Sequence, residues 1–219
     1  MQARMGSTRL PGKILRPLDR TTVLGSILSR LLRLKHSATT VIATTDAPKD
    51  DVVEAFCRDN GVICFRGCEA NVLKRFYRCA QHYKFDHIVR LTADNPFPDI
   101  EELDNLIELH CTTGDAFSHS FPSLPVGVGA EIFTFSALEQ SFLEGKAPHH
   151  LEHVDEYMLE NPGKFKTTVL EVTSGKRRPD IRLTIDTEED LRRARFVAEH
   201  ASCEHFSTEE AIQLCTEFA

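Results

Sequence analysis

Residues 39–65 read "TTVIATTDAPKDDVVEAFCRDNGVICF", and this stretch decides the fold class. The β-branched run "TTVIAT" is typical of a strand. The following segment, "APKDDVVEAFCRDNG", has a proline near its start, acidic residues in its first turn and Gly61 after its end, which are helix start and stop signals. "VICF" then forms another strand. Strands that alternate with helices at such short intervals predict an α/β fold with a mostly parallel sheet.

The same alternation continues on both sides of this stretch. Upstream, "VLGSILSRLLRLK" repeats apolar residues at helical spacing, and Thr21 or Thr22 can cap that helix. Downstream come a helix, "NVLKRFYRCAQHYK", a strand, "HIVRLT", and a helix from about residue 101 to 110. Residues 115–173 are less regular and predict a β/α insertion. The strand "IRLTID" and the helices "TEEDLRRARFVAEH" and "STEEAIQLCTEF" then return to the sheet, so we expect one domain over residues 1–219.

Composition and charge argue against several classes of protein. The 219 residues carry a formal net charge of −7, which argues against a general nucleic-acid binder because such proteins show a basic excess. No apolar run approaches the ~20 residues that span a membrane, and the N-terminus lacks the apolar core of a signal peptide. The seven cysteines are odd in number and scattered, which favours reduced thiols and a cytoplasmic protein.

Residues 3–13, "ARMGSTRLPGK", combine small, hydroxyl and basic residues in one predicted loop. Glycines let the backbone approach a ligand closely, while hydroxyl and basic side chains add donors and positive charge. These residues are Arg4, Gly6, Ser7, Thr8, Arg9, Gly12 and Lys13. The spacing fits neither G-x-x-x-x-G-K-[ST] nor G-x-G-x-x-G. We interpret the loop as a polyphosphate site, because a solvated basic arm would not need its glycines and proline.

Two aspartates follow predicted strands. Asp94 comes just after "HIVRLT" and Asp186 just after "IRLTI". Ligands of open α/β sheets bind outside the carboxyl ends of strands, so both carboxylates can converge on one site, where they would suit Mg²⁺. The alternatives are local: Asp186 can cap the helix that follows it, and Asp94 can form a turn with Asn-Pro.

Six segments together resemble a known family. They are "QARMGSTRLPGKIL", "VIATTD", "FRGCEANVLKRFY", "IVRLTADNPFPD", "HHLEHVDEYMLENPGKF" and "RLTIDTEEDL". Their order and spacing resemble the cytidylyltransferases that activate acidic sugars, such as acylneuraminate and 3-deoxy-manno-octulosonate, and the nearest branch is the spore-coat polysaccharide biosynthesis type. The resemblance covers nearly the whole chain. It implies a single Rossmann-like, mostly parallel sheet with helices on both faces, as in nucleotide-diphospho-sugar transferases.

The resemblance also implies an activity: transfer of CMP from CTP to an acidic nonulosonate- or octulosonate-like sugar, with release of pyrophosphate, in surface polysaccharide biosynthesis. Asp94 and Asp186 would hold Mg²⁺, and residues 115–173 would serve the acceptor sugar and a homodimer contact. The expected catalytic residues are Arg9, Lys13 and Asp94. The expected nucleotide-binding residues are Ala3, Arg4, Gly6, Ser7, Thr8, Asn71 and Arg75. The expected sugar-binding residues are Glu131, Glu152 and His153.

In this family an apolar strand precedes the phosphate loop, at the centre of the sheet. Here only Met1, Gln2 and Ala3 precede Arg4. The first strand is therefore expected to be truncated: either the start was assigned too far downstream, or the chain was cut, or the sheet lacks its innermost strand. In the last case the loop would be poorly anchored.

Three other interpretations stay open. Asn71 stands where many relatives have an aspartate, and residues 128–130 lack an acid that relatives commonly carry, which favours a non-catalytic nucleotide- or sugar-binding homologue. The second is a glycosyltransferase that uses a nucleotide sugar. Against it, no D-x-D motif follows "HIVRLT". The third is a zinc site at His149 and His153, which are four residues apart on one helical face.

Overall fold

The computed structural model describes residues 1–121 and 123–218 and confirms the predicted α/β fold. Its strands are β1 (Val41–Thr45), β2 (Ile63–Gly67), β3 (His87–Arg90), β4 (Phe117–His119), β5 (Glu131–Thr134) and β6 (Thr167–Val169). β1 and β2 pair in parallel, and the other strands pair in the order β3-β5-β4-β6. Only β5 runs against its neighbours, since β4 and β6 are parallel. The sheet is therefore mixed but mostly parallel.

Gln2 joins these two groups of strands. It forms parallel bridges to Ala43 on one side and Thr92 on the other. Its N–H donates to the carbonyl of Leu91 (3.0 Å), and its own carbonyl accepts from the N–H of Ala93 (2.9 Å). The first strand is thus reduced to one bridging residue, as expected from the few residues before Arg4. It still makes the sheet continuous from β2 to β6.

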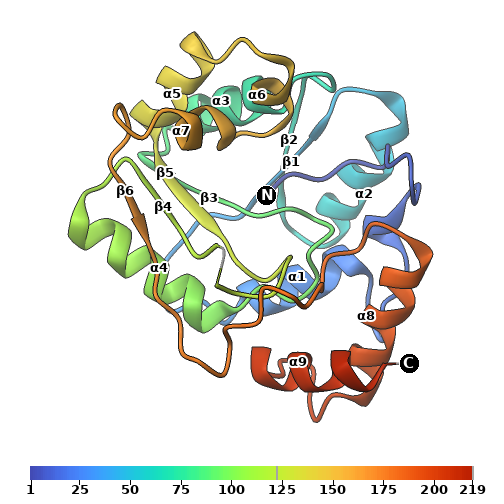
Figure 1. Cartoon of the computed structure of the whole chain (residues 1–219). Helices are drawn as coiled ribbons and strands as arrows, with labels where there is room; N and C mark the ends of the chain where they lie inside the picture. Colours follow the sequence, from blue (N-terminus) through green and yellow to red (C-terminus); the bar gives the residue numbers. More distant parts are fainter. Residues whose placement is uncertain (122, 219) are drawn as a thin grey trace.

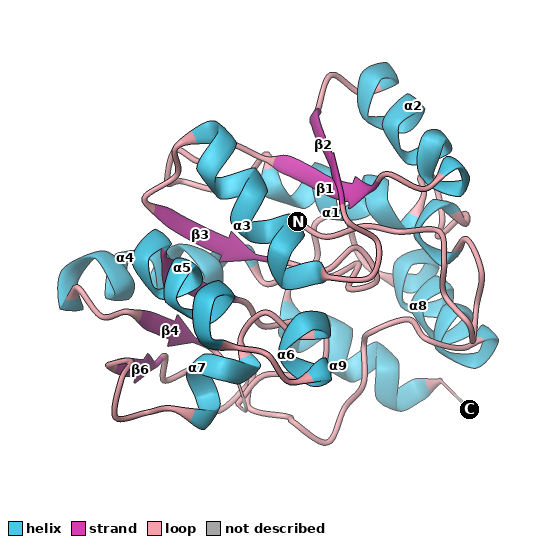
Figure 2. Ribbon diagram, turned by 90° about the horizontal axis from the view of Figure 1, so that it is seen from above, coloured by secondary structure: helices cyan, strands magenta, loops and turns pink. Residues whose placement is uncertain are grey.

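Helices cover both faces of the sheet, which is the predicted Rossmann-like arrangement. They are α1 (Val23–Leu31), α2 (Asp51–Asp59), α3 (Val72–Tyr83), α4 (Ile100–Thr113), α5 (Phe135–Glu144), α6 (Pro148–Glu152), α7 (Glu156–Glu160), α8 (Glu188–His200) and α9 (Thr208–Glu217), with short 3₁₀ helices η1 (Lys13–Leu15) and η2 (Pro48–Asp50). In Figure 1, α3 and α5–α7 lie above the sheet, whereas α1, α4 and α9 lie below it. Figure 2 shows the strands from above, with β2 at one end and β6 at the other.

Each layer has its own buried apolar cluster. Phe76 of α3 packs with Phe133 of β5 and Met158 of α7 on one face. On the opposite face, Leu106 of α4 packs with Ile132 of β5 among residues of α8 and α9. Phe133 and Leu106 are fully buried. Neighbouring residues of β5 therefore point to opposite faces, as expected for a strand buried between two helical layers.

The helices begin where their sequence signals predict. Thr22 caps α1 by accepting a hydrogen bond from the N–H of Gly25, so the second of the two candidate threonines is used. Thr187 and Ser207 cap α8 and α9 in the same way, each ahead of acidic residues that favour the positive end of the helix dipole. The helix starts therefore agree with the local capping signals of the sequence.

In two regions the secondary structure differs from the one predicted from the sequence. Residues 115–173 contain β4, β5 and β6, so this range supplies three strands of the main sheet in addition to α5–α7. "IRLTID" is not a regular strand: Arg182 forms a single parallel bridge with Val126. Its neighbours add two hydrogen bonds, from Val126 N–H to the Ile181 carbonyl and from Leu183 N–H to the Val126 carbonyl, both 2.8 Å. Such short pairing still fixes the path of the chain toward Asp186.

Gly127, beside that bridge, provides a test of this packing. Its φ is +94°, and a Cβ there would lie 2.7 Å from the backbone nitrogen of Thr184. We expect Gly127→Ala to lower the free energy of unfolding by about 2–4 kcal/mol, because strain and a backbone clash add. Urea unfolding measures the change. Gly163→Ala is the control, since no atom lies within 4 Å of its Cβ position. Equal stability of the two variants would contradict this account.

Among residues 1–121 and 123–218, no helix combines the length and apolar character needed to cross a bilayer.

Candidate active site

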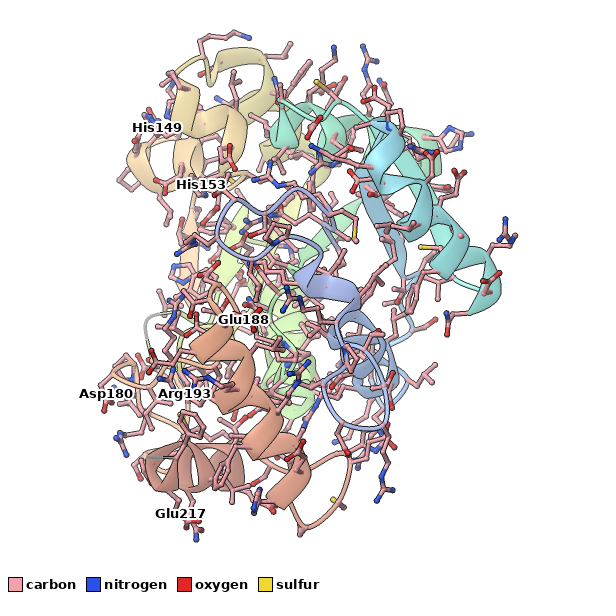
Figure 3. The ribbon with its side chains drawn as sticks, turned by 90° about the vertical axis from the view of Figure 1, so that its right-hand side faces the viewer. His149, His153, Asp180, Glu188, Arg193 and Glu217 are labelled. Carbon is pink, nitrogen blue, oxygen red and sulfur yellow. The ribbon has the colours of Figure 1, made fainter. Side chains whose placement is uncertain are left out.

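Most of the predicted site residues line one cavity of about 290 Å³. Its lining includes Ala3, Arg4, Gly6, Ser7, Thr8, Arg9, Lys13, Arg75, Asp94, Glu152, His153 and Asp186. Figure 3 shows the opening loop between the segment that carries His153 and the helix that carries Glu188. Larger cavities of about 610 and 400 Å³ lie beside Met1 between β1 and β3, and they contain none of these residues. The charged cavity is the candidate active site.

Lys13 lies between the two predicted metal-binding aspartates. Its Nζ is 2.7 Å from Asp94 Oδ2 and 2.9 Å from Asp186 Oδ1, and it also donates to the carbonyl of Ile185 at 2.6 Å. The lysine is 7% exposed. The structure therefore brings together three charged groups from distant parts of the chain, with one cation shared by two carboxylates.

Backbone contacts hold the two aspartates in this position. The N–H of Ile185 donates to the carbonyl of Asp94 at 2.9 Å, which ties the two segments to each other. Thr187 caps α8 in a capping box with Asp190, so Asp186 is not the helix cap. Asp94 does lie in a turn, in which the Asn95 N–H donates to the Thr92 carbonyl. The carboxylate of Asp186 is consequently free to face the cavity.

Basic residues surround Asp186. Besides Lys13, Arg9 lies 2.7 Å from its Oδ1, and Arg182 contacts its Oδ2. Burial alone would raise the pKa of Asp186, but the hydrogen bond from Lys13 and the charges of Lys13 and Arg9 bring it below its ordinary value. The carboxylate is therefore ionised at neutral pH and available to a cation. Arg182 was not among the predicted residues, because its position depends on the bridge to Val126.

Asp50 anchors the opening loop. It was not among the site residues predicted from the sequence. Its side chain is fully buried at the end of η2; Oδ1 accepts the Met5 N–H at 2.6 Å and Oδ2 accepts the Thr45 hydroxyl. The loop also closes on itself, since the N–H of Gly12 donates to the Met5 carbonyl at 3.0 Å. Gly12 has a φ of +71°, which suits glycine. These contacts anchor the loop despite the short strand before it.

Removing this anchor should affect both stability and binding. We expect Asp50→Ala to lower the free energy of unfolding by about 2–4 kcal/mol, because the Met5 N–H and the Thr45 hydroxyl lose their buried acceptor. Binding of an anion in the cavity should weaken, since the loop would lose order while its side chains remain. Urea unfolding and a titration with inorganic pyrophosphate measure the two effects.

The neighbouring Asp51 is a matched control for Asp50. Its side chain is 63% exposed and pairs with Arg66 on the surface. Asp51→Ala should change the free energy of unfolding by less than about 1 kcal/mol. A similar loss in both variants would show that Asp50 has no special role in the loop.

Arg75 and Asn71 occupy different positions although both were predicted to bind nucleotide. Arg75 lines the cavity, is 1% exposed and donates from Nη1 to the Cys68 carbonyl at 2.7 Å. Burial lowers the pKa of Arg75, and the charge of Arg4 lowers it further. Asn71 instead caps α3 by accepting the Lys74 N–H at 2.7 Å. The geometry thus presents Arg75 to a bound anion, while the Asn71 side chain is engaged in the helix start.

The three predicted sugar-binding residues also separate. Glu152 lines the cavity and pairs with Arg4 at 2.8 Å, and His153 follows it in the lining. Glu131 is 1% exposed on β5, where it contacts Arg90 of the paired strand β3 and lies outside this lining. Burial raises the pKa of Glu131 to about 7, against the opposing charge of Arg90. The structure therefore presents Glu152 and His153, but not Glu131, to a ligand in the cavity.

The charges of the lining suit a polyphosphate with a divalent cation. Basic side chains come from the opening loop and from Arg75, and carboxylates come from Asp94, Asp186 and Glu152. Two carboxylates already converge on one ammonium group, so they fit a small, hard cation that prefers oxygen ligands. A divalent cation would neutralise those two carboxylates, and the basic side chains of the lining would then face an anionic ligand. This set of groups suits positioning and charge neutralisation in phosphoryl chemistry.

Known proteins resemble this chain in sequence and in fold. The family described as "Cytidylyltransferase" matches residues 1–215. The spore coat polysaccharide biosynthesis protein SpsF of Bacillus subtilis is 39% identical over 195 residues, which cover 87% of this chain and 81% of SpsF. A solved cytidylyltransferase from Leptospira borgpetersenii is 35% identical, with a TM-score of 0.92 over 99% of this chain and 92% of that one. CMP:2-keto-3-deoxy-manno-octonic acid synthetase, which was solved with CTP, shares the fold with a TM-score of 0.66. It is 18% identical, and the match covers 89% of this chain and 94% of the synthetase.

Proposed function

The chain belongs to the cytidylyltransferase family, and from this premise we propose that it transfers CMP from CTP to a sugar and releases pyrophosphate. The observation that carries the proposal is the position of Lys13 between Asp94 and Asp186 within a basic, glycine-containing loop. A nucleotidyl transfer needs cations around the phosphates and carboxylates for a metal, and this cavity supplies both.

The opening loop would hold the triphosphate. Backbone N–H groups near Gly6 and the side chains of Ser7 and Thr8 offer donors, while Arg4 and Arg75 lie in the same lining. A sugar hydroxyl would attack the α-phosphorus, and the bond to the β-phosphate oxygen would break as pyrophosphate leaves. Lys13 and Arg9 are the cations placed to neutralise charge that develops during this step. Little other covalent chemistry is required of the protein.

Asp94 and Asp186 are the residues that would hold Mg²⁺. Bound there, the cation would polarise the phosphoryl oxygens and favour the deprotonated form of the attacking hydroxyl. Lys13, which contacts both carboxylates, would then be released toward the phosphates. The paired carboxylates and the low pKa of Asp186 support this assignment.

We propose an acidic sugar as the acceptor, in the biosynthesis of a surface polysaccharide. The related SpsF is named for spore coat polysaccharide biosynthesis, and the more distant CMP:2-keto-3-deoxy-manno-octonic acid synthetase is named for an acidic sugar. Glu152 and His153 come from residues 115–173, which supports a role for this range in acceptor binding. Arg4 pairs with Glu152, so it lies at the boundary between the phosphate and acceptor sides.

A substrate panel tests this function. The full chain is incubated with each nucleoside triphosphate, Mg²⁺ and acidic sugars of the nonulosonate and octulosonate types, and pyrophosphate is measured. We expect release with CTP and one class of acidic sugar, dependent on the divalent cation. Sugar phosphates as acceptors form the comparison arm.

The same panel separates the alternatives. Nucleotide binding without pyrophosphate release from any sugar would favour a non-catalytic homologue. Transfer of a sugar from a CMP-sugar to an acceptor would favour a glycosyltransferase. Either result would replace the proposed reaction.

A further inference from the structure

The short helices α6 and α7 carry a cluster of metal-binding side chains outside the cavity. His149 and His150 lie on α6, and Glu160 ends α7. His149 Nε2 is 2.7 Å from Glu160 Oε1, and His150 Nε2 is 2.6 Å from Oε2. One ligand atom from each residue lies within 4.8 Å of the others. We propose that these three side chains form a binding site for a divalent transition-metal ion of the Zn²⁺ type.

The donor set determines which metal would bind. Two imidazoles and one carboxylate suit Zn²⁺, Ni²⁺ or Cu²⁺, whereas Mg²⁺ prefers oxygen ligands alone. This site is therefore chemically distinct from Asp94 and Asp186. In a tetrahedral zinc site with bonds of ~2.0–2.2 Å, neighbouring ligand atoms stand roughly 3.3 Å apart. The present contacts of 2.6–2.7 Å would have to open by less than about 1 Å.

The cluster is partly fixed and partly open. The side chain of His150 is 10% exposed, and its ring packs edge-on against Tyr157 with centroids 5.2 Å apart. His149 and Glu160 are each about half exposed. One ligand is therefore held in place by packing, while the open side gives an ion a path of entry and leaves room for a water ligand.

Metal binding would change which nitrogen of the His150 ring carries the proton. Its Nδ1 accepts the N–H of Ala147 at 3.3 Å, so the proton of the neutral ring lies on Nε2, where it is donated to Glu160. A metal at Nε2 requires this proton to move to Nδ1, and the long hydrogen bond from Ala147 would be lost. The two states are thus distinguished by the tautomer of this one histidine.

The site is connected to the cavity by a short path. Figure 3 shows His149 at the outer side of this region and His153 toward the opening loop. Glu152, the last residue of α6, pairs with Arg4, and His153 lines the cavity. An ion that ties α6 to α7 would restrict the position of both residues. This consequence rests on the proposed function, whereas the metal site itself does not.

Zinc titration of the full chain tests the site. Calorimetry gives affinity and stoichiometry, and two-dimensional ¹H–¹⁵N spectra of the histidine rings report the tautomers. We expect one ion to bind the His149–His150–Glu160 cluster, with the proton of the His150 ring moving from Nε2 to Nδ1. Glu160→Gln and His149→Gln should each weaken binding about 100-fold, because loss of even an outer-shell partner costs 10–100-fold.

Matched variants separate this site from other zinc-binding groups. Glu199→Gln removes an exposed glutamate of α8, and His153→Gln removes the nearby histidine that is outside the cluster; neither should change zinc affinity. Equal affinity of the wild type and Glu160→Gln, or binding that leaves the His150 tautomer unchanged, would overturn the proposal and point to the free cysteines. Circular dichroism confirms that each variant is folded. Pyrophosphate release is independent of this outcome, so failure here would leave the proposed reaction unaffected.

Discussion

Lys13→Met should lower kcat/KM for pyrophosphate release by about 10²–10³-fold, or ~3–4 kcal/mol of transition-state stabilisation. The ammonium group of Lys13 contacts both Asp94 and Asp186, at 2.7 and 2.9 Å. Methionine keeps most of the length and the apolar stem but removes the charge that would neutralise the phosphates. Steady-state kinetics with CTP and the accepted sugar measure the loss.

The same variant has a second readout that does not depend on activity. Without Lys13, two carboxylates face each other with less positive charge, so the pKa of Asp186 should rise from its lowered value. A carboxylate with a lowered pKa stabilises the fold above its unfolded pKa of about 4 and loses this contribution as the pH falls through the folded pKa. We therefore expect Lys13→Met to be less stable by about 2–3 kcal/mol at neutral pH. The difference should shrink below about pH 4.

Lys84→Met is the matched control for Lys13→Met. Lys84 is exposed at the C-terminal end of α3, outside the cavity lining. Its replacement should leave kcat/KM within about twofold of the wild type. Wild-type-like pyrophosphate release by Lys13→Met would refute the catalytic assignment, whereas equal losses in both variants would show a general effect of removing positive charge.

Asp94→Asn should lower turnover by at least about 10³-fold and weaken the response to Mg²⁺. Asparagine keeps the shape of the side chain but removes the negative charge that a divalent cation requires, and a cation held by Asp186 alone would be poorly positioned. Raising the Mg²⁺ concentration should restore part of the activity if the variant still binds CTP. Kinetics across a magnesium titration measure both effects.

Two comparisons support or reject this assignment. Asp186→Asn should give a similar loss, because both carboxylates contact the same ammonium group and belong to one site. Asp180→Asn removes an exposed carboxylate paired with Arg178 and should leave the magnesium dependence unchanged. A magnesium response in Asp94→Asn identical to that of the wild type would place the metal elsewhere.

The sequence predicted those parts of the site that depend on local chemistry. The glycines, hydroxyls and basic residues of residues 3–13 predict a polyphosphate site, and most of these residues line one cavity. Parallel-sheet topology predicts the convergence of Asp94 and Asp186, although the segment before Asp186 forms a single bridge and not a regular strand. The helix caps at Thr187 and Ser207 follow from residue type and spacing alone.

Other features of the site could not be predicted from the sequence, because they depend on contacts between segments that are distant along the chain. Asp50 and Asp51 are adjacent acids at the start of a helix, yet only Asp50 is buried against the opening loop. Glu131 carries the same functional group as Glu152, yet pairing of β3 with β5 places it against Arg90. His149 and His153 were one possible pair of metal ligands, but the helical run breaks between α6 and α7, and the structure places His149 beside His150 and Glu160 instead.

The sequence by itself determined the α/β class, the N-caps at Thr187 and Ser207 and the composition of the opening loop, because these depend on the spacing of neighbouring residues. Only the tertiary structure decided how the loop is anchored, which carboxylates face the cavity and which are buried. Gln2 shows the difference most clearly. A single residue has no strand signal of its own. Gln2 lies at the centre of the sheet because its backbone bonds to Leu91 and Ala93 on one side, while Met1 and Ala3 bond to Ala43 on the other.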